Sequence, residues 1–172
     1  MDIIDEVLQH PYYLRQLQVL QTYEQDRCFC RHDMAHFQEV ARIAKVIAGQ
    51  NSLSIPQEMI TLAALFHDMG RVQEYEQTIS HAEASAAFAR EILFALDYPS
   101  TRIEEICQAI LAHSRRQDAE VRYARAFQIR TLGELISYAD QFSRKCYMCS
   151  AASDCKWPKE QRILQNYYPD DL

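Results

Sequence analysis

Glycine and proline, the residues that most often interrupt helices, are scarce in this sequence. The 172 residues include three glycines and five prolines, and no Asn-Gly pair separates runs of alternating apolar residues. A chain in which 48% of the residues are apolar, with no stretch of low complexity, is unlike disordered or fibrous proteins. The absence of hairpin signals also disfavours β-sheet architectures. We therefore expect a globular helical protein.

The sequence also lacks a long apolar run. None is long enough to span a bilayer, and the segment from Met1 to Glu6 has neither the basic flank nor the apolar core of a secretion signal. We therefore expect a cytoplasmic protein with no membrane partner. In that compartment, the six cysteines are expected to be reduced thiols or metal ligands rather than a disulfide framework.

Basic residues are in the minority. The chain has 24 acidic against 18 basic residues, and its formal net charge of −6 argues against a broad surface for long nucleic acids. Small anions can still bind in a locally basic pocket. No glycine-rich phosphate loop occurs, which disfavours a kinase or ordinary NTPase, and no nucleophile elbow supports Ser-His-Asp acyl transfer. No motif indicates an oligomeric state.

Apolar residues recur at three- and four-residue spacing along nearly the whole chain, which predicts an all-α fold. The chain length fits one domain over residues 1–172, with a core at about 30–145, an N-terminal helical extension and a C-terminal tail that contains cysteines.

Helix boundaries are marked by cap patterns at Ser54, Ser80, Thr101 and Thr131. The expected helices are one that begins after His10-Pro11, then Arg31 to Ala48, Ser54 to Gly70, Ser80 to Leu96, Thr101 to His113, and Thr131 through Phe142. The pattern leaves residues 116–128 open between loop and helix. The segment from Cys146 to Cys155 is expected to be irregular, and a short last helix is expected from Trp157-Pro158.

Three histidines stand at the ends of apolar helical stripes. His36 shares helical spacing with Val40 and Ile43, which directs its imidazole toward the core. His67 and His113 follow apolar residues at the same spacings. The repeated pattern predicts three imidazoles that face the interior.

Two acids accompany these histidines. Asp68 adjoins His67, and Asp140 lies four residues after Ile136, near the interior side of the last long helix. A buried acid is costly unless it is paired or bound to a metal. Imidazoles and carboxylates together suit divalent iron, manganese, zinc or nickel, and the residue types do not select one of them.

Each of these residues also has a structural alternative. Asp140 could pair with Arg144 one turn later, Asp68 could be a helix-end residue near Arg71, and a single histidine on an apolar face is often only a core residue. We assign structural roles of this kind to His10 and His32. Since His32 lies four residues before His36, it is the first substitute if one of the metal ligands is assigned wrongly.

The segments HDMAHFQEVARIA at residues 32–44 and AALFHDMGR at residues 63–71 resemble the HD-domain phosphohydrolase superfamily. The resemblance covers roughly residues 30–145 and implies a single-domain HD-type helical bundle. The superfamily signature is a His, a His-Asp pair and a distant Asp, and members with two metals have two more histidines before the last Asp. The matching positions are His36, His67, Asp68, His81, His113 and Asp140. The resemblance thus implies a dinuclear metal centre bridged by Asp68, with a single metal as the alternative.

The resemblance further implies a phosphohydrolase or phosphodiesterase that uses metal-activated water on a small, nucleotide-like phosphate ester or anhydride. Asp68 and Arg71 are the expected catalytic residues. The residues expected to bind substrate are Arg71, Arg115, Arg144 and Lys145, and each could instead be a solvated surface charge. The chain lacks the Gly-Tyr-Pro signature of the cyclic-dinucleotide subgroup. The alternatives are a non-catalytic HD module that senses a metal or nucleotide, and an interaction module whose histidines only pack.

Three cysteines within ten residues of the C-terminal tail suggest a second metal site, but they lack a fourth ligand. Cys30 lies six residues before His36, and Cys146 lies six residues after Asp140. Six helical residues span roughly 9 Å. If His36 and Asp140 meet at one metal on antiparallel helices, Cys30 and Cys146 are displaced in the same direction and become neighbours.

We therefore predict a structural site of four thiolates at Cys30, Cys146, Cys149 and Cys155. Cys28 is the alternative first ligand, and Cys107, on an apolar helix face, is expected to be core. Zinc is the preferred metal because its closed tetrahedral sites are structural, with an iron–sulfur cluster or reduced cysteines without metal as the alternatives.

Overall fold

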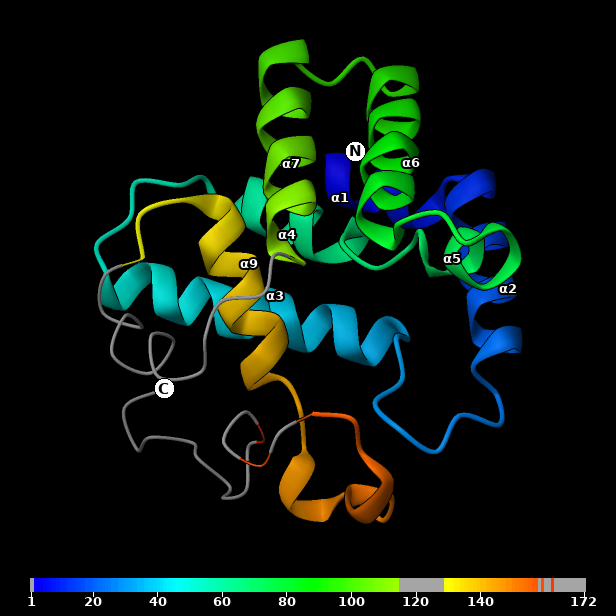
Figure 1. Cartoon of the computed structure of the whole chain (residues 1–172). Coiled ribbons are helices and arrows are strands. Elements are labelled where there is room, and N and C mark those ends of the chain that lie inside the picture. Colours follow the sequence, from blue (N-terminus) through cyan, green and yellow to red (C-terminus); the bar gives the residue numbers. More distant parts are fainter. Residues whose placement is uncertain (1, 115–128, 158, 160–161, 163–172) are drawn as a thin grey trace.

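The computed structural model describes residues 2–114, 129–157, 159 and 162, and over these residues it is helical with no strand (Figure 1). The α-helices are α1 (Ile3–Gln9), α2 (Pro11–Tyr23), α3 (Met34–Gln50), α4 (Gln57–Phe66), α5 (Arg71–Gln77), α6 (His81–Ala95), α7 (Ser100–His113) and α9 (Leu132–Phe142). Two 3-10 turns follow, at Cys146–Met148 and Ala152–Asp154. The all-α prediction is confirmed. None of the described helices is both long and apolar enough to cross a membrane.

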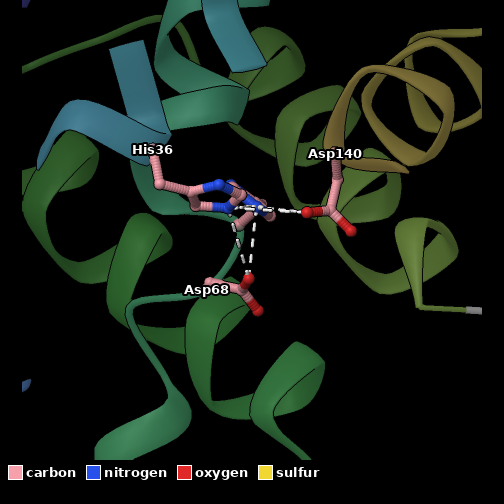
Figure 2. A group of neighbouring side chains, drawn as sticks. His36, Asp68 and Asp140 are labelled. Carbon is pink, nitrogen blue, oxygen red and sulfur yellow. Dashed lines mark hydrogen bonds and ion pairs between the residues drawn. The ribbon is translucent and has the colours of Figure 1, made fainter. Parts of the chain in front are cut away.

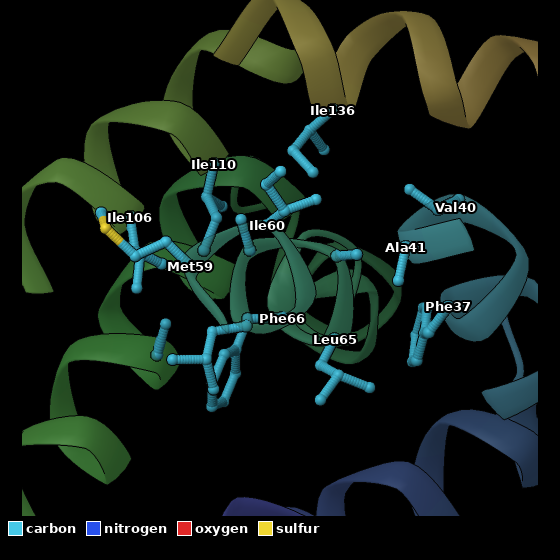
Figure 3. Close-up of a cluster of buried hydrophobic side chains, with 14 of the residues drawn as sticks. Phe37, Val40, Ala41, Met59, Ile60, Leu65, Phe66, Ile106, Ile110 and Ile136 are labelled. Atoms are coloured by element: carbon cyan, nitrogen blue, oxygen red, sulfur yellow. The ribbon is translucent and has the colours of Figure 1, made fainter. Parts of the chain in front are cut away.

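Helix α4 is the centre of the core. Seven of its ten residues are buried, and a helix that is apolar on all sides is stable only when neighbours surround it. Those neighbours are α1, α3, α6, α7 and α9. Ile110 of α7 and Ile136 of α9 lie near Ile60 of α4, and Phe37 of α3 lies on the side of Leu65 (Figure 3). Each such side chain contributes about 1.5–3 kcal/mol when fully buried.

The cap patterns are only partly realised. At α9 the capping box forms, because Thr131 Oγ1 accepts from the Glu134 N–H and the Glu134 carboxylate accepts from the Thr131 N–H. The expected caps at Ser54 and Thr101 are wrong, since α4 and α7 begin directly after Pro56 and Pro99 without a side-chain cap. A proline fixes φ and has no N–H, so it is well placed to start a helix one residue later.

Other boundaries also differ from the sequence-based expectation. The helix expected over Arg31 to Ala48 begins at Met34, because Asp33 caps it by accepting from the His36 N–H. Ser80 does precede α6, but its side chain makes no cap hydrogen bond. The expectations for residues 116–128, and for most of the last helix after Trp157, fall outside the described residues.

The helix expected to end at Gly70 ends at Phe66 instead, and residues 67–70 form a turn that leads into α5. Gly70 explains this difference, because its backbone lies against the start of α6 and its N–H donates to Ser85 Oγ at 2.8 Å. A Cβ at this position would lie 2.3 Å from the Ser85 nitrogen and 2.4 Å from the His81 carbonyl oxygen. From the other side, Gln16 of α2 donates to the Met69 carbonyl at 3.1 Å. The turn is therefore held between α2 and α6.

We predict that Gly70→Ala destabilises the fold, because the added methyl group must push the turn away from α6. The expected loss is about 1–3 kcal/mol in the free energy of unfolding, measured by denaturant titration. Gly49→Ala in α3 is the matched control, since a Cβ at Gly49 has nothing within 4 Å. It should be neutral or slightly stabilising. Equal stability of the two variants would show that the close approach at Gly70 does not constrain the turn.

Candidate metal centre

The six residues expected to bind metal come from different elements and meet in one place. Four lie at helix ends or in a turn: His36 in the first turn of α3, His67 directly after α4, His81 as the first residue of α6, and His113 as the last residue of α7. Asp68 follows His67 in the turn, and Asp140 lies in α9. All six side chains converge around the carboxylate of Asp68, which is 1% exposed.

One group of ligand atoms comes from His36, His67, Asp68 and Asp140, and these atoms all lie within 4.8 Å of one another (Figure 2). The Nε2 atoms of His36 and His67 are 3.3 Å apart. Asp68 Oδ2 lies 3.3 Å from His67 Nε2, and Asp140 Oδ1 lies 3.5 Å from His36 Nε2. Two nitrogens and two carboxylate oxygens at such spacing form a donor set for one divalent cation.

A second group consists of Asp68, His81 and His113. Asp68 Oδ1 lies 3.5 Å from His81 Nε2 and 3.8 Å from His113 Nε2. The two oxygens of Asp68 therefore face two different sets of imidazoles. This is the arrangement expected of a carboxylate that bridges two metal ions.

Hydrogen bonds outside the cluster fix how the imidazoles are oriented. Nδ1 of His67 donates to the Ala64 carbonyl at 2.7 Å, and Nδ1 of His113 donates to the Ile110 carbonyl. A carbonyl oxygen only accepts, so each Nδ1 carries a hydrogen and Nε2 is the atom presented to the cluster. Backbone carbonyls orient metal-binding histidines in this way in other proteins.

His81 and His36 are oriented by side chains. Nδ1 of His81 lies 3.0 Å from a Glu74 carboxylate oxygen, which can only accept. Nδ1 of His36 lies 3.3 Å from Ser143 Oγ, and that hydroxyl donates to the Asp140 carbonyl at 2.7 Å. Since the hydroxyl hydrogen is used there, the oxygen accepts from His36. All four imidazoles thus direct Nε2 inward, as a metal centre requires.

The acids of the cluster are held in their ionised form. Burial raises the pKa of the Asp68 carboxyl, but the charges of Arg71 and His67 outweigh it and hold that pKa well below its ordinary value. Burial acts likewise on Asp140, and the neighbouring Arg144 and His36 lower its pKa. Asp68 Oδ1 lies 2.9 Å from Arg71 Nε, yet it makes no hydrogen bond of standard geometry to any described residue. A buried carboxylate oxygen of this kind fits a metal ligand.

The pKa values of the His36 and His67 imidazoles are shifted in opposite directions. Burial lowers the pKa of His36 to about 4, so this ring is neutral at pH 7 and free to act as a ligand. Burial also lowers the pKa of His67, but the charge and hydrogen bond of Asp68 outweigh it and raise that pKa above its ordinary value. A cation that binds here needs this ring in its neutral form, because a protonated imidazole cannot be a ligand.

His32 lies closer to the cluster than its expected structural role implies. This histidine is buried, its Nε2 lies 3.6 Å from Asp68 Oδ2, and its Nδ1 donates to Glu24 at 2.6 Å. Glu24 also accepts from the Tyr75 hydroxyl at 2.6 Å, and its pKa is lowered to about 2 because the interactions with His32 outweigh the effect of burial. His32 belongs to neither group of candidate ligands, whereas His36 belongs to the first. The spacing between His32 and His36 was the available signal, whereas nothing in the sequence pointed to Glu24.

A cavity of about 420 Å³ opens beside the cluster. His36 and Asp140 line it on the side of the cluster, and its cationic lining residues are Arg27, Arg71, Arg144, Lys156 and Arg162. We call it the basic cavity. Of the residues expected to bind substrate, Arg71 and Arg144 line this cavity. Lys145 is exposed and lines a neighbouring cavity instead, and Arg115 lies outside the described residues.

Both arginines already have partners in the cluster, as the structural alternatives anticipated. Arg71 pairs with Asp68 at 2.9 Å and with Glu74 at 3.1 Å. Arg144 pairs with Asp140 at 3.2 Å, and its guanidinium lies 4.0 Å from the centre of the Trp157 ring. These ion pairs coexist with the clustering of the imidazoles, so the two interpretations of Asp68 and Asp140 are not exclusive.

The predicted cysteine ligands line the same basic cavity: Cys30, Cys146, Cys149 and Cys155. Cys28 does not line it. Cys107 is fully buried and its thiol donates to the Ala86 carbonyl, which confirms it as a core residue.

The chain is similar to known proteins over most of its length. An uncharacterized protein of Clostridium beijerinckii is 32% identical over 168 residues, which cover 98% of this chain and 100% of that protein. The crystal structure of a predicted HD superfamily hydrolase from an uncultured Thermotogales bacterium matches with a TM-score of 0.58 and 20% identity, over 95% of this chain and 88% of that one. That match shows a shared fold.

A protein-family model also matches most of the chain. The family model described as the HD domain matches residues 34–145, a range that begins at the first residue of α3 and contains all six residues of the cluster. The chain therefore belongs to the HD-domain family.

Proposed function

We propose that this protein is a metal-dependent phosphohydrolase that cleaves a phosphate ester or anhydride of a small, nucleotide-like substrate. One observation supports it above others: four inward-facing imidazole nitrogens and the carboxylates of Asp68 and Asp140 converge at the edge of the basic cavity. Divalent cations held there would activate water for attack on phosphorus and neutralise charge on the phosphoryl oxygens.

The charge of the basic cavity supports an anionic substrate. Of the residues that the structure describes, five Lys or Arg side chains and one acid, Asp140, line it, although the whole chain has a net charge of −6. Positive charge is thus concentrated where the candidate ligands are. A phosphorylated small molecule matches both the sign of that charge and the volume of about 420 Å³.

Asp68 has a central part in the proposed mechanism. Its two oxygens face the two groups of imidazoles, so it is the residue that would bridge a pair of cations. Arg71 contacts Oδ1 and lines the basic cavity, which keeps Asp68 ionised and adds a fixed positive charge where a phosphoryl group would lie. Arg144 has the corresponding place beside Asp140. Fixed charges of this kind stabilise a transition state without reorganisation.

We predict that the purified protein hydrolyses phosphate esters in the presence of manganese or ferrous iron, and that Asp68→Ala lowers kcat/KM by at least ~10²-fold. Mutation of groups that only orient metal ligands costs about 10- to 100-fold, so loss of a bridging ligand should cost more. A panel of nitrophenyl phosphates, nucleotides and dinucleoside polyphosphates checks this. Asp5→Ala, an exposed acid in α1, is the matched control and should keep full activity.

The helical circular dichroism spectrum of Asp68→Ala should be unchanged, so that lost activity is not lost folding. A protein that binds metal but turns over none of these substrates would instead support a sensor module. Full activity in Asp68→Ala would refute the proposed role of that residue.

Manganese titration tests the number of cations. We predict two Mn²⁺ per chain, counted by loss of the free-ion electron paramagnetic resonance signal, and about one in His113→Ala, which removes a ligand of the second group alone. Manganese prefers nitrogen and oxygen ligands, so thiols do not contribute to this count. His10→Ala, at the start of α2, is the control and should retain both. One Mn²⁺ in the parent protein, unaffected by His113→Ala, would contradict a dinuclear centre.

A further inference from the structure

Four cysteines from two distant segments line one wall of the basic cavity. Cys30 lies in the connection between α2 and α3, and the other three lie on or beside the two 3-10 turns after α9. The surroundings of Cys30 raise the pKa of its thiol: partial burial raises it, Arg144 lowers it, and the nearby Cys146 and Cys149 raise it further. The thiols are thus within electrostatic reach of one another.

The neighbourhood of Cys30 and Cys146 follows from the metal centre. Cys30 precedes the first residue of α3, and Cys146 follows the last residue of α9. His36 Nε2 and Asp140 Oδ1 are 3.5 Å apart, which brings the first turn of α3 beside the last turn of α9. The spacing in the sequence predicts that these two cysteines are neighbours. Cys30 lines the basic cavity with the other three cysteines, whereas Cys28 lines the neighbouring cavity with Cys30 and Cys149, so we take Cys30 as the first ligand.

The segment that carries the three later cysteines has almost no hydrophobic core of its own. Among residues 146–157, Ala151 alone is buried. The segment is held mainly by polar contacts, in which Arg162 donates to the backbone carbonyls of Ala152, Cys155 and Trp157 at 2.7–2.9 Å. A short segment that buries so little apolar surface usually needs a metal or a disulfide to stay folded.

We propose that Cys30, Cys146, Cys149 and Cys155 bind one zinc ion, separate from the histidine and aspartate cluster, and that this ion fastens the C-terminal segment to the start of α3. Four thiolates match the closed tetrahedral set of structural zinc sites. Four thiolates with Zn²⁺ carry a net charge of −2, which Arg27 and Arg162 beside the cysteines offset, while Arg71 and Arg144 lie beside the candidate ligands Asp68 and Asp140. Arg27 donates to the Cys30 carbonyl at 2.8 Å, and Arg162 donates to that of Cys155 at 2.9 Å.

Zinc binding also requires the thiols to move closer together. With Zn–S bonds of about 2.3 Å, sulfur atoms in a tetrahedral site are roughly 3.8 Å apart. Among the described residues, groups of three or more possible ligand atoms that all lie within 4.8 Å of one another occur only around Asp68. The thiols that line the cavity are therefore farther apart than the sulfur atoms of a zinc site. The cysteines lie on short turns of a segment with one buried residue, which can close at little cost in packing.

Cobalt substitution tests this proposal on the unmodified chain. Reduced protein reconstituted with Co²⁺ should show the intense near-ultraviolet band of thiolate-to-cobalt charge transfer, at one equivalent per chain, and Zn²⁺ should abolish it. The histidine and aspartate cluster has no sulfur and cannot produce this band. Absence of the band from fully reduced protein would overturn the proposal.

Serine variants then identify the ligands. Cys30→Ser and Cys149→Ser should each lose most of the band, and zinc-loaded Cys149→Ser should melt at least about 5 °C below the parent protein. Cys28→Ser, a matched change at an exposed thiol two residues from Cys30, should keep the band and the melting temperature. Loss of the band in Cys28→Ser with retention in Cys30→Ser would overturn the assignment of Cys30.

Two further outcomes are informative without any variant. Modification of four thiols should release one zinc ion, measured with a zinc-binding dye. Purified protein that contains iron and acid-labile sulfide in place of zinc would overturn the choice of metal. The cobalt band and the manganese count are independent measurements, so failure of the cysteine site is distinguishable from failure of the proposed function.

Discussion

The ionised carboxylate of Asp68 is buried where several helix ends meet, and its charge determines which groups must surround it. An ionised acid at 1% exposure is tolerated only if opposite charges or metal ions surround it. Here Arg71 contacts Oδ1 of Asp68. Five imidazoles also place Nε2 within 4 Å of one of the Asp68 oxygens: those of His32, His36, His67, His81 and His113. These groups come from four parts of the chain, namely the start of α3, the turn between α4 and α5, the start of α6 and the end of α7, so these elements must pack in one arrangement to supply them.

The fold meets this requirement by ending helices at the cluster. The turn after α4 carries His67 and Asp68, α6 begins at His81, and α7 ends at His113. Gly70 lets the turn approach α6 closely enough for His81 to face Asp68. Around the cluster, carbonyls, Glu74 and Ser143 fix the imidazole orientations. The core around α4 supplies stability, and the helix ends supply the chemistry.

Much of this arrangement can be predicted from the sequence. The features that cannot be predicted depend on contacts between residues far apart in the chain. Periodicity places His36, His67 and His113 on inward faces because the same apolar residues that define the helices also define the core. The spacing of Cys30 and Cys146 from the cluster predicts that they are neighbours. Helix ends at Phe66 and Met34 were misplaced, because a close backbone approach at Gly70 and a cap at Asp33 depend on tertiary neighbours. Glu24 could not be found, since its role comes from contacts with His32 and Tyr75 that no local pattern encodes.

We propose that Asp68 bridges two cations, one bound with His36, His67 and Asp140 and the other with His81 and His113. Anomalous diffraction from crystals grown with Mn²⁺ tests it most directly. The account predicts two anomalous peaks about 3.5–4 Å apart, one near each oxygen of Asp68. Electron density with no metal at Asp68, or with both peaks remote from His36 and His113, would contradict it.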